Sequence, residues 1–163
     1  MKYLLSILLT ASYCTLIAQK PDIDQLLMLS KKTTDQLPEI IATSGSEVES
    51  GEANLMIYAF ETDTLTIREM EQSNEVIYKT NDSDTYNTFE KTLTEKGFKM
   101  VHTTMHYYSN ERAVSMTYRD KTSIVLVKVT LDSRFFPSGR HVYHIEKIIK
   151  EGSNTFLFTI RPI

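Results

Sequence analysis

Cysteine is almost absent from this chain: the only one, Cys14, lies in the apolar stretch that opens the sequence. After Lys2 that stretch carries no charged side chain, and it ends on Ala18 before a polar segment. A basic start, an apolar middle and a small exit residue are typical of a secretory signal peptide. The stretch is also short for a membrane span, which needs about 20 apolar residues. We therefore predict that residues 1–18 are a signal peptide, cleaved between Ala18 and Gln19.

There are two alternatives to simple cleavage of the signal peptide: lipid attachment at Cys14, and retention of residues 1–18 as an uncleaved membrane anchor. Lipid attachment requires a small residue before the cysteine, where this chain has Tyr13, and only Lys2 would mark the inner side of an anchor. Cleavage removes 18 of the 163 residues and leaves 145 without any thiol. Disulfides, thiolate metal ligands and cysteine nucleophiles are then excluded, so a hydrophobic core must hold one domain together. We expect an exported bacterial protein, periplasmic or secreted, with no membrane span after cleavage.

Basic runs are also missing, because the longest is Lys31-Lys32. Proteins that bind nucleic acid usually have a clustered basic face. Loss of Lys2 with the signal shifts the formal net charge from −3 to −4. The charge pattern therefore predicts no nucleic-acid partner and no electrostatic attraction to polyanions.

Closely spaced glycines, which phosphate and dinucleotide sites need, are absent as well. The nearest pair, Gly45 and Gly51, stands among glutamates that would repel phosphate. No serine lies in the Gly-x-Ser-x-Gly pattern of hydrolases. We predict no cofactor, and the sequence favours a protein that is not an enzyme.

The mature chain divides into an N-terminal helical segment (19–42), an acidic linker or loop (43–54) and a domain over 55–163. Apolar residues three and four apart predict a helix over 22–36 and a second one over 84–96, before Gly97. Short runs of β-branched and aromatic residues predict strands at 55–60, 64–67, 76–78, 98–108, 112–118, 123–131, 141–149 and 156–160. This order predicts an α+β fold, an antiparallel meander packed on one face by one or two helices. The sequence shows no internal repeat.

The segment 132–140 is the strongest candidate for a binding surface. Phe135 and Phe136 are adjacent, and Arg134 and Arg140 flank them; aromatic and arginine residues are enriched at interfaces. Tyr107 and Tyr108, at the end of a predicted strand, could extend this surface. The alternative is that one of the phenylalanines packs into the core.

The histidines form a second candidate set. His102 and His106, four apart on a predicted strand, should face the same way about 13 Å apart, too far to share one ion. A metal site would need one of them beside His144 and Glu146 of another strand. Cross-strand polar packing is the competing interpretation.

The leading functional hypothesis is an exported, non-enzymatic envelope protein, a small binding or accessory module for a protein, peptide or glycan. Aromatic side chains of the 132–140 loop and of the sheet face would contact this unknown envelope or extracellular ligand. Two alternatives are an envelope metal-binding protein or hydrolase that uses the histidines, and a structural subunit of an envelope assembly.

Overall fold

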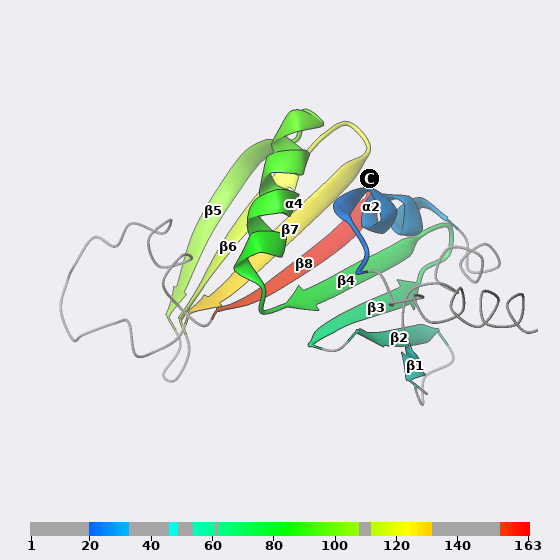
Figure 1. Ribbon diagram of the computed structural model, residues 1–163. Helices are drawn as coiled ribbons and strands as arrows, with labels where there is room; N and C mark the ends of the chain where they lie inside the picture. The colour runs from blue at the N-terminus through cyan, green and yellow to red at the C-terminus, as the bar shows by residue number, and fades with distance from the viewer. Residues whose placement is uncertain (1–19, 33–45, 49–53, 61, 108–111, 132–153) are drawn as a thin grey trace, which may run out of the picture.

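The computed structural model describes residues 20–32, 46–48, 54–60, 62–107, 112–131 and 154–163. Within them the chain forms two helices and one sheet (Figure 1). The helices are α2 (Ile23–Lys31) and α4 (Ser83–Glu95). The strands are β1 (Ser46–Val48), β2 (Leu55–Phe60), β3 (Asp63–Glu69), β4 (Asn74–Thr80), β5 (Lys99–Tyr107), β6 (Arg112–Arg119), β7 (Ser123–Leu131) and β8 (Thr155–Pro162).

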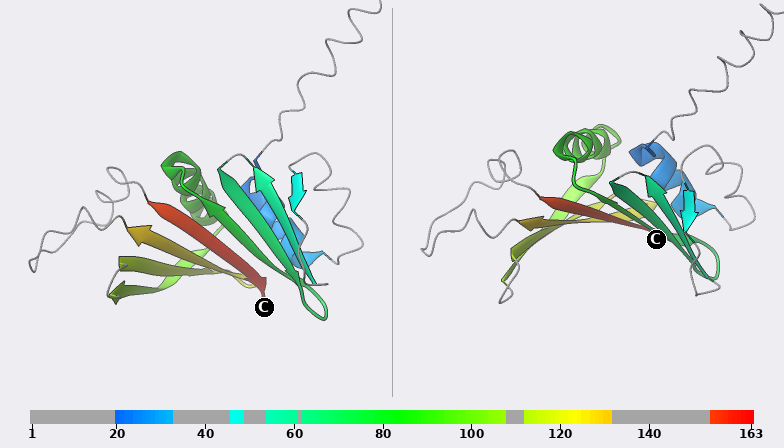
Figure 2. Two further views of the ribbon diagram at one scale, coloured as in Figure 1. Left: turned by 90° about the horizontal axis from the view of Figure 1, so that it is seen from below. Right: turned by 60° about the horizontal axis from the view of Figure 1, so that its bottom comes forward.

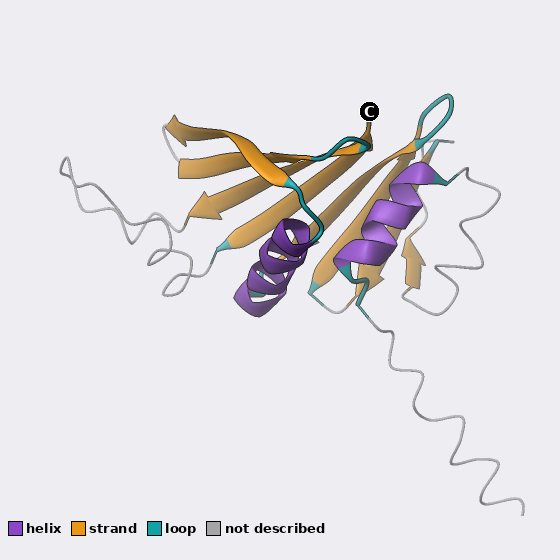
Figure 3. Ribbon diagram, turned by 90° about the horizontal axis from the view of Figure 1, so that it is seen from above, coloured by secondary structure: helices purple, strands orange, loops and turns teal. Residues whose placement is uncertain are grey.

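The sheet has the strand order β1-β2-β3-β4-β8-β7-β6-β5, and every neighbouring pair is antiparallel. Both described helices lie on the same face of the twisted sheet (Figures 2 and 3). The prediction of an antiparallel α+β fold covered on one face by helices is therefore confirmed.

Among the described elements one arrangement occurs twice, a helix followed by four strands. The fourth strands of the two halves, β4 and β8, pair at the centre, and the first strands, β1 and β5, lie at the two edges. The sequence did not reveal this repeat, because topology and not residue identity relates the halves.

Helix α4 forms as its sequence predicts. Asp82 caps its first turn, and Gly97 follows its end with a φ of 84°, in the left-handed region. The predicted apolar stripe is buried: Tyr86 stacks on Phe156 of β8, with ring centroids 4.6 Å apart. Phe89 meets Phe158 edge to face at 5.0 Å. Aromatic pairs of this kind add about 0.5–1.5 kcal/mol each beyond the area they bury.

Helix α2 begins with a capping box, in which Asp22 and Gln25 each accept the other's backbone N–H. The Asp22 carboxylate accepts the Gln25 N–H at 2.8 Å, and the Gln25 side chain accepts the Asp22 N–H at 2.9 Å. The helix ends at Lys31, earlier than the sequence predicts. Its far end is held to the sheet, because the Asn74 amide donates to the carbonyls of Leu29 and Lys32.

The structure differs from the sequence-based prediction in the acidic segment, and it leaves one predicted strand untested. Ser46–Val48, inside the acidic segment 43–54, forms a three-residue strand antiparallel to β2. The strand predicted at 141–149 lies outside the described residues.

One polar cluster is buried beneath the helices. The Asp63 carboxylate, with no exposed surface, accepts the Tyr78 hydroxyl at 2.6 Å and pairs with the Lys20 ammonium at 3.0 Å. Burial alone would raise the pKa of Asp63, but hydrogen bonds from Tyr78, Lys20 and Thr80 outweigh it and hold that pKa below its ordinary value. Burial and then the bond to Asp63 raise the pKa of Tyr78. Lys20, the first described residue, is thereby tied to the sheet.

Replacing Asp63 by asparagine should destabilise the fold by about 1–3 kcal/mol at neutral pH, because the buried Tyr78 hydroxyl loses a charged acceptor. A carboxyl group with a lowered folded pKa stabilises the native state above its unfolded pKa of about 3.9. That stabilisation is lost as the pH falls through the folded value. The difference in unfolding free energy between wild type and Asp63→Asn, measured in urea, should therefore shrink below about pH 4.

Glu71→Gln, in an exposed turn, is the control. A pH-independent difference would contradict this account.

Candidate functional site

The candidate site is the sheet face opposite α2 and α4, which we name the uncovered face because no described helix or strand lies over it (Figure 2). Side chains alternate along each strand, so the register decides which residues reach this face. All aromatic residues of the described strands belong to the helix side: Tyr58, Phe60, Tyr78, Tyr107, Tyr118, Phe156 and Phe158. No aromatic side chain of the described strands therefore reaches the uncovered face, and the expected contact through aromatic residues of the sheet stays a prediction.

The uncovered face is strongly basic although the chain is acidic. Its only described acidic side chain is Glu75, against six basic ones: Arg68, Lys79, Lys99, Arg119, Lys128 and Arg161. The formal net charge of the whole chain is −3. An average over the chain thus hides a concentrated positive field, and the sequence-based argument against attraction to polyanions does not hold for this face.

Four of the basic residues share one row across the strands, which we name the basic row. From β3 to β5 the row reads Arg68, Glu75, Arg161, Ile124, Arg119 and Lys99. Neighbouring strands lie about 4.8 Å apart, so the row is about 24 Å long. Each strand supplies one residue, and no two members are adjacent in the sequence.

The Glu75 carboxylate offsets the repulsion between two neighbouring arginines of the row, Arg68 and Arg161. Its carboxylate accepts Arg68 Nη1 at 3.0 Å and Arg161 Nε at 2.5 Å. The Glu75 side chain is 5% exposed, whereas those of Arg68 and Arg161 are 50% and 61% exposed. One carboxylate therefore orients two guanidinium groups and leaves a net positive charge facing solvent.

Beside the basic row the face has an apolar middle. Ile77 and Leu126 both stand opposite Thr159 of β8, and Leu126 is 38% exposed. In the next row, Leu157 lies between Lys79 and Lys128. Aliphatic side chains are thus bordered on both sides by basic ones.

The basic row continues into a groove of about 610 Å³ at the end of the sheet, lined by Lys96, Gly97, Lys99, Val101, Arg119, Asp120, Lys121 and Thr122. The one carboxylate of this lining is occupied by its own turn, since Asp120 Oδ1 accepts the Thr122 and Ser123 N–H groups at 2.7 Å each. Burial would raise the pKa of Asp120, but these backbone bonds prevail and lower it. Lys96 pairs with Asp24. Lys99, Arg119 and Lys121 give the groove its positive charge.

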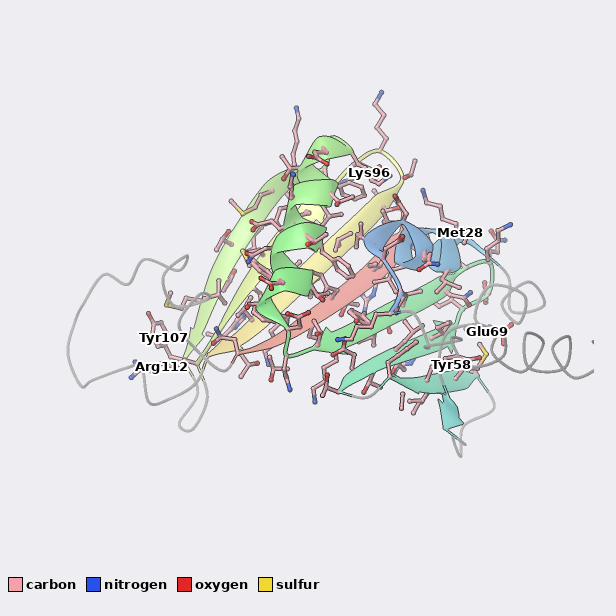
Figure 4. All side chains as sticks on the ribbon, in the orientation of Figure 1. Met28, Tyr58, Glu69, Lys96, Tyr107 and Arg112 are labelled. Atoms are coloured by element: carbon pink, nitrogen blue, oxygen red, sulfur yellow. The ribbon has the colours of Figure 1, made fainter. Side chains whose placement is uncertain are left out.

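The aromatic candidates lie elsewhere or outside the description. Tyr107 ends β5 on the helix side with 70% of its surface exposed, and Figure 4 shows it beside Arg112 at the opposite end of β5 from Lys96. The remaining candidates fall outside the described residues: Tyr108, Arg134, Phe135, Phe136 and Arg140.

The two described histidines of the candidate set lie on the uncovered face, and each contacts a different hydroxyl group. His102 and His106 share this face, as the sequence predicts, and each meets a hydroxyl: His102 Nε2 lies 2.6 Å from Thr104 Oγ1, and His106 Nε2 lies 3.0 Å from Ser115 Oγ. His144 and Glu146 lie outside the described residues. Within the described part, no three His, Cys, Asp or Glu side chains gather to hold a metal ion. Neither described helix is long and apolar enough to cross a membrane.

We expect Zn²⁺ to leave the melting temperature of the protein unchanged. His102 and His106 are about 13 Å apart along the strand, so they cannot share one ion. A metal that binds only the native state must raise the melting temperature. A rise that disappears in His102→Ala or His106→Ala would contradict this expectation and favour the metal-binding alternative.

Comparison with known proteins assigns no function to this arrangement. No protein-family model, curated protein or solved structure matches the chain. The basic row, its apolar border and the adjoining groove are therefore interpreted from their own chemistry.

Proposed function

We propose that the protein is an exported, non-enzymatic binding module whose uncovered face binds an acidic protein or peptide. The observation that carries this proposal is the charge of that face, where the described strands place six basic side chains against one acidic in a chain of net charge −3. Complementary charge attracts and orients such a partner more than it adds raw affinity.

The apolar middle of the face supports a protein or peptide partner. Protein interfaces have a core depleted of charge and a polar rim. Ile77, Leu126 and Leu157 would provide that core, with the basic row on one side and Lys79 and Lys128 on the other. An extended acidic segment could place apolar side chains on the aliphatic residues and its carboxylates on the arginines.

Export rests on the leader, and the start of the fold is compatible with its removal. Lys20, two residues after the expected cleavage point, pairs with the buried Asp63. Pro21 is buried and Asp22 caps α2. Cleavage after Ala18 would retain all of these contacts, and the module would act in the periplasm or outside the cell.

A charge reversal on the uncovered face tests the proposal. Arg119→Glu should weaken binding of poly-glutamate, used as the acidic probe, at least about tenfold at low salt, a loss of about 1.4 kcal/mol. Lys91→Glu, the same charge change on the exposed surface of α4, should leave the affinity within about twofold. Wild-type binding should also weaken as salt rises, since exposed charges are screened.

The same three proteins would then be immobilised against an envelope extract of the host. A partner of acidic sequence retained by wild type and Lys91→Glu, but lost from folded Arg119→Glu, is the expected result. Equal loss in both variants would mean that only net charge matters. Equal retention in all three would refute the uncovered face as the binding surface.

A further inference from the structure

Strand β5 is an edge strand of the described sheet, and it has little of the usual protection against pairing. It ends the sheet of the described chain, and Lys99 to Thr103 are all exposed. Edge strands are normally guarded against pairing by charged side chains, proline or bulges. From Met100 to Tyr107 this strand has no charged residue and no proline, and its one irregularity is a register shift between Met100 and His102.

Exposed apolar side chains are concentrated on the same strand. Of the eight large exposed hydrophobic residues in the described chain, four belong to β5: Met100 (58%), Val101 (57%), Met105 (38%) and Tyr107 (70%). All four belong to a strand that forms one edge of the described sheet. A long uncharged edge bordered by apolar side chains is a template for another strand.

We propose that two copies of the protein pair through β5, antiparallel, about a twofold axis at Thr104. In this register Thr104 faces Thr104 of the partner subunit, and Thr103 faces the partner's Met105. Val101, the extra residue at the register shift, then lies next to the partner's Tyr107, which brings together two of the most exposed apolar residues of the described chain. A twofold interface uses the same patch on both subunits, and no pair in this register sets like charges opposite each other.

A second copy fits this edge better than a charged peptide does. The strand Met100–Tyr107 offers no charge that would select an acidic or basic sequence, whereas its own side chains complement each other. The twofold axis also places both uncovered faces on the same side of one continuous sheet. Each partner's Tyr107 would stand beside Val101, which lines the basic groove. The dimer would therefore present two basic rows to one acidic partner.

A cysteine at Thr104 tests the register directly. The mature chain from Gln19 has no cysteine, and residues directly opposite in an antiparallel pair have Cα atoms about 4.5–5.5 Å apart, within disulfide range. Thr104→Cys should form an intermolecular disulfide under mild oxidation. Thr103→Cys should not, because its own copy would lie about 8 Å away, beyond the limit of about 7 Å.

Light scattering after size exclusion tests the dimer itself. Wild type should have the mass of two mature chains, and Thr103→Lys should raise the dissociation constant at least about tenfold, since it sets a lysine against the partner's Met105. Thr88→Lys, on the exposed surface of α4, should remain a dimer. Circular dichroism verifies that each variant is folded. A wild-type monomer at submillimolar concentration, or a disulfide at Thr103 in place of Thr104, would overturn the proposal.

Discussion

The antiparallel pairing of β4 with β8 is the constraint on which the rest of this structure depends. It joins two halves that are otherwise separate meanders, β1 to β4 and β5 to β8. On the helix side it places Tyr78 opposite Phe158, beneath Phe89 of α4. On the other side it brings Arg161 to Glu75, 86 residues earlier in the chain. The aromatic core and the centre of the basic row are therefore set by one register.

This coupling makes the register hard to change. A shift of one residue along β8 would turn Phe156, Phe158 and Ile160 to the uncovered face and Leu157 and Arg161 toward the helices. The three core residues are fully buried, and burying each stabilises the fold by about 1.5–3 kcal/mol relative to exposure. The aromatic core under α4 thus enforces the row of charges on the opposite face.

Patterns local in sequence could be predicted, and those that depend on pairing could not. The alternation of Val114, Met116 and Tyr118 predicts a strand with one buried face, and the Tyr86–Phe89–Leu93 stripe predicts α4. The basic row takes single residues from six strands, so neither net charge nor a search for basic runs reveals it. Strand register decides that the aromatic side chains of the strands lie on the helix side. The sequence does not show this register, so sequence reasoning alone could not exclude these residues from a binding face.

The uncovered face also shows how a like-charged surface can persist in a stable fold. Arg68 and Arg161 occupy flanking positions on either side of β4, and Glu75 between them replaces repulsion by two charge-assisted hydrogen bonds. Lys99 and Arg119 stand opposite each other on β5 and β6 at the other end of the row, and within the described part of the chain no carboxylate forms a salt bridge with either of them. Like charges directly opposite in a sheet are destabilising.

A carboxylate from a bound partner would relieve the repulsion between Lys99 and Arg119 as Glu75 does between Arg68 and Arg161. A partner that binds only the folded chain would also stabilise the folded state. The unrelieved half of the row is therefore where an acidic ligand gains most, next to the groove whose own carboxylate is already engaged.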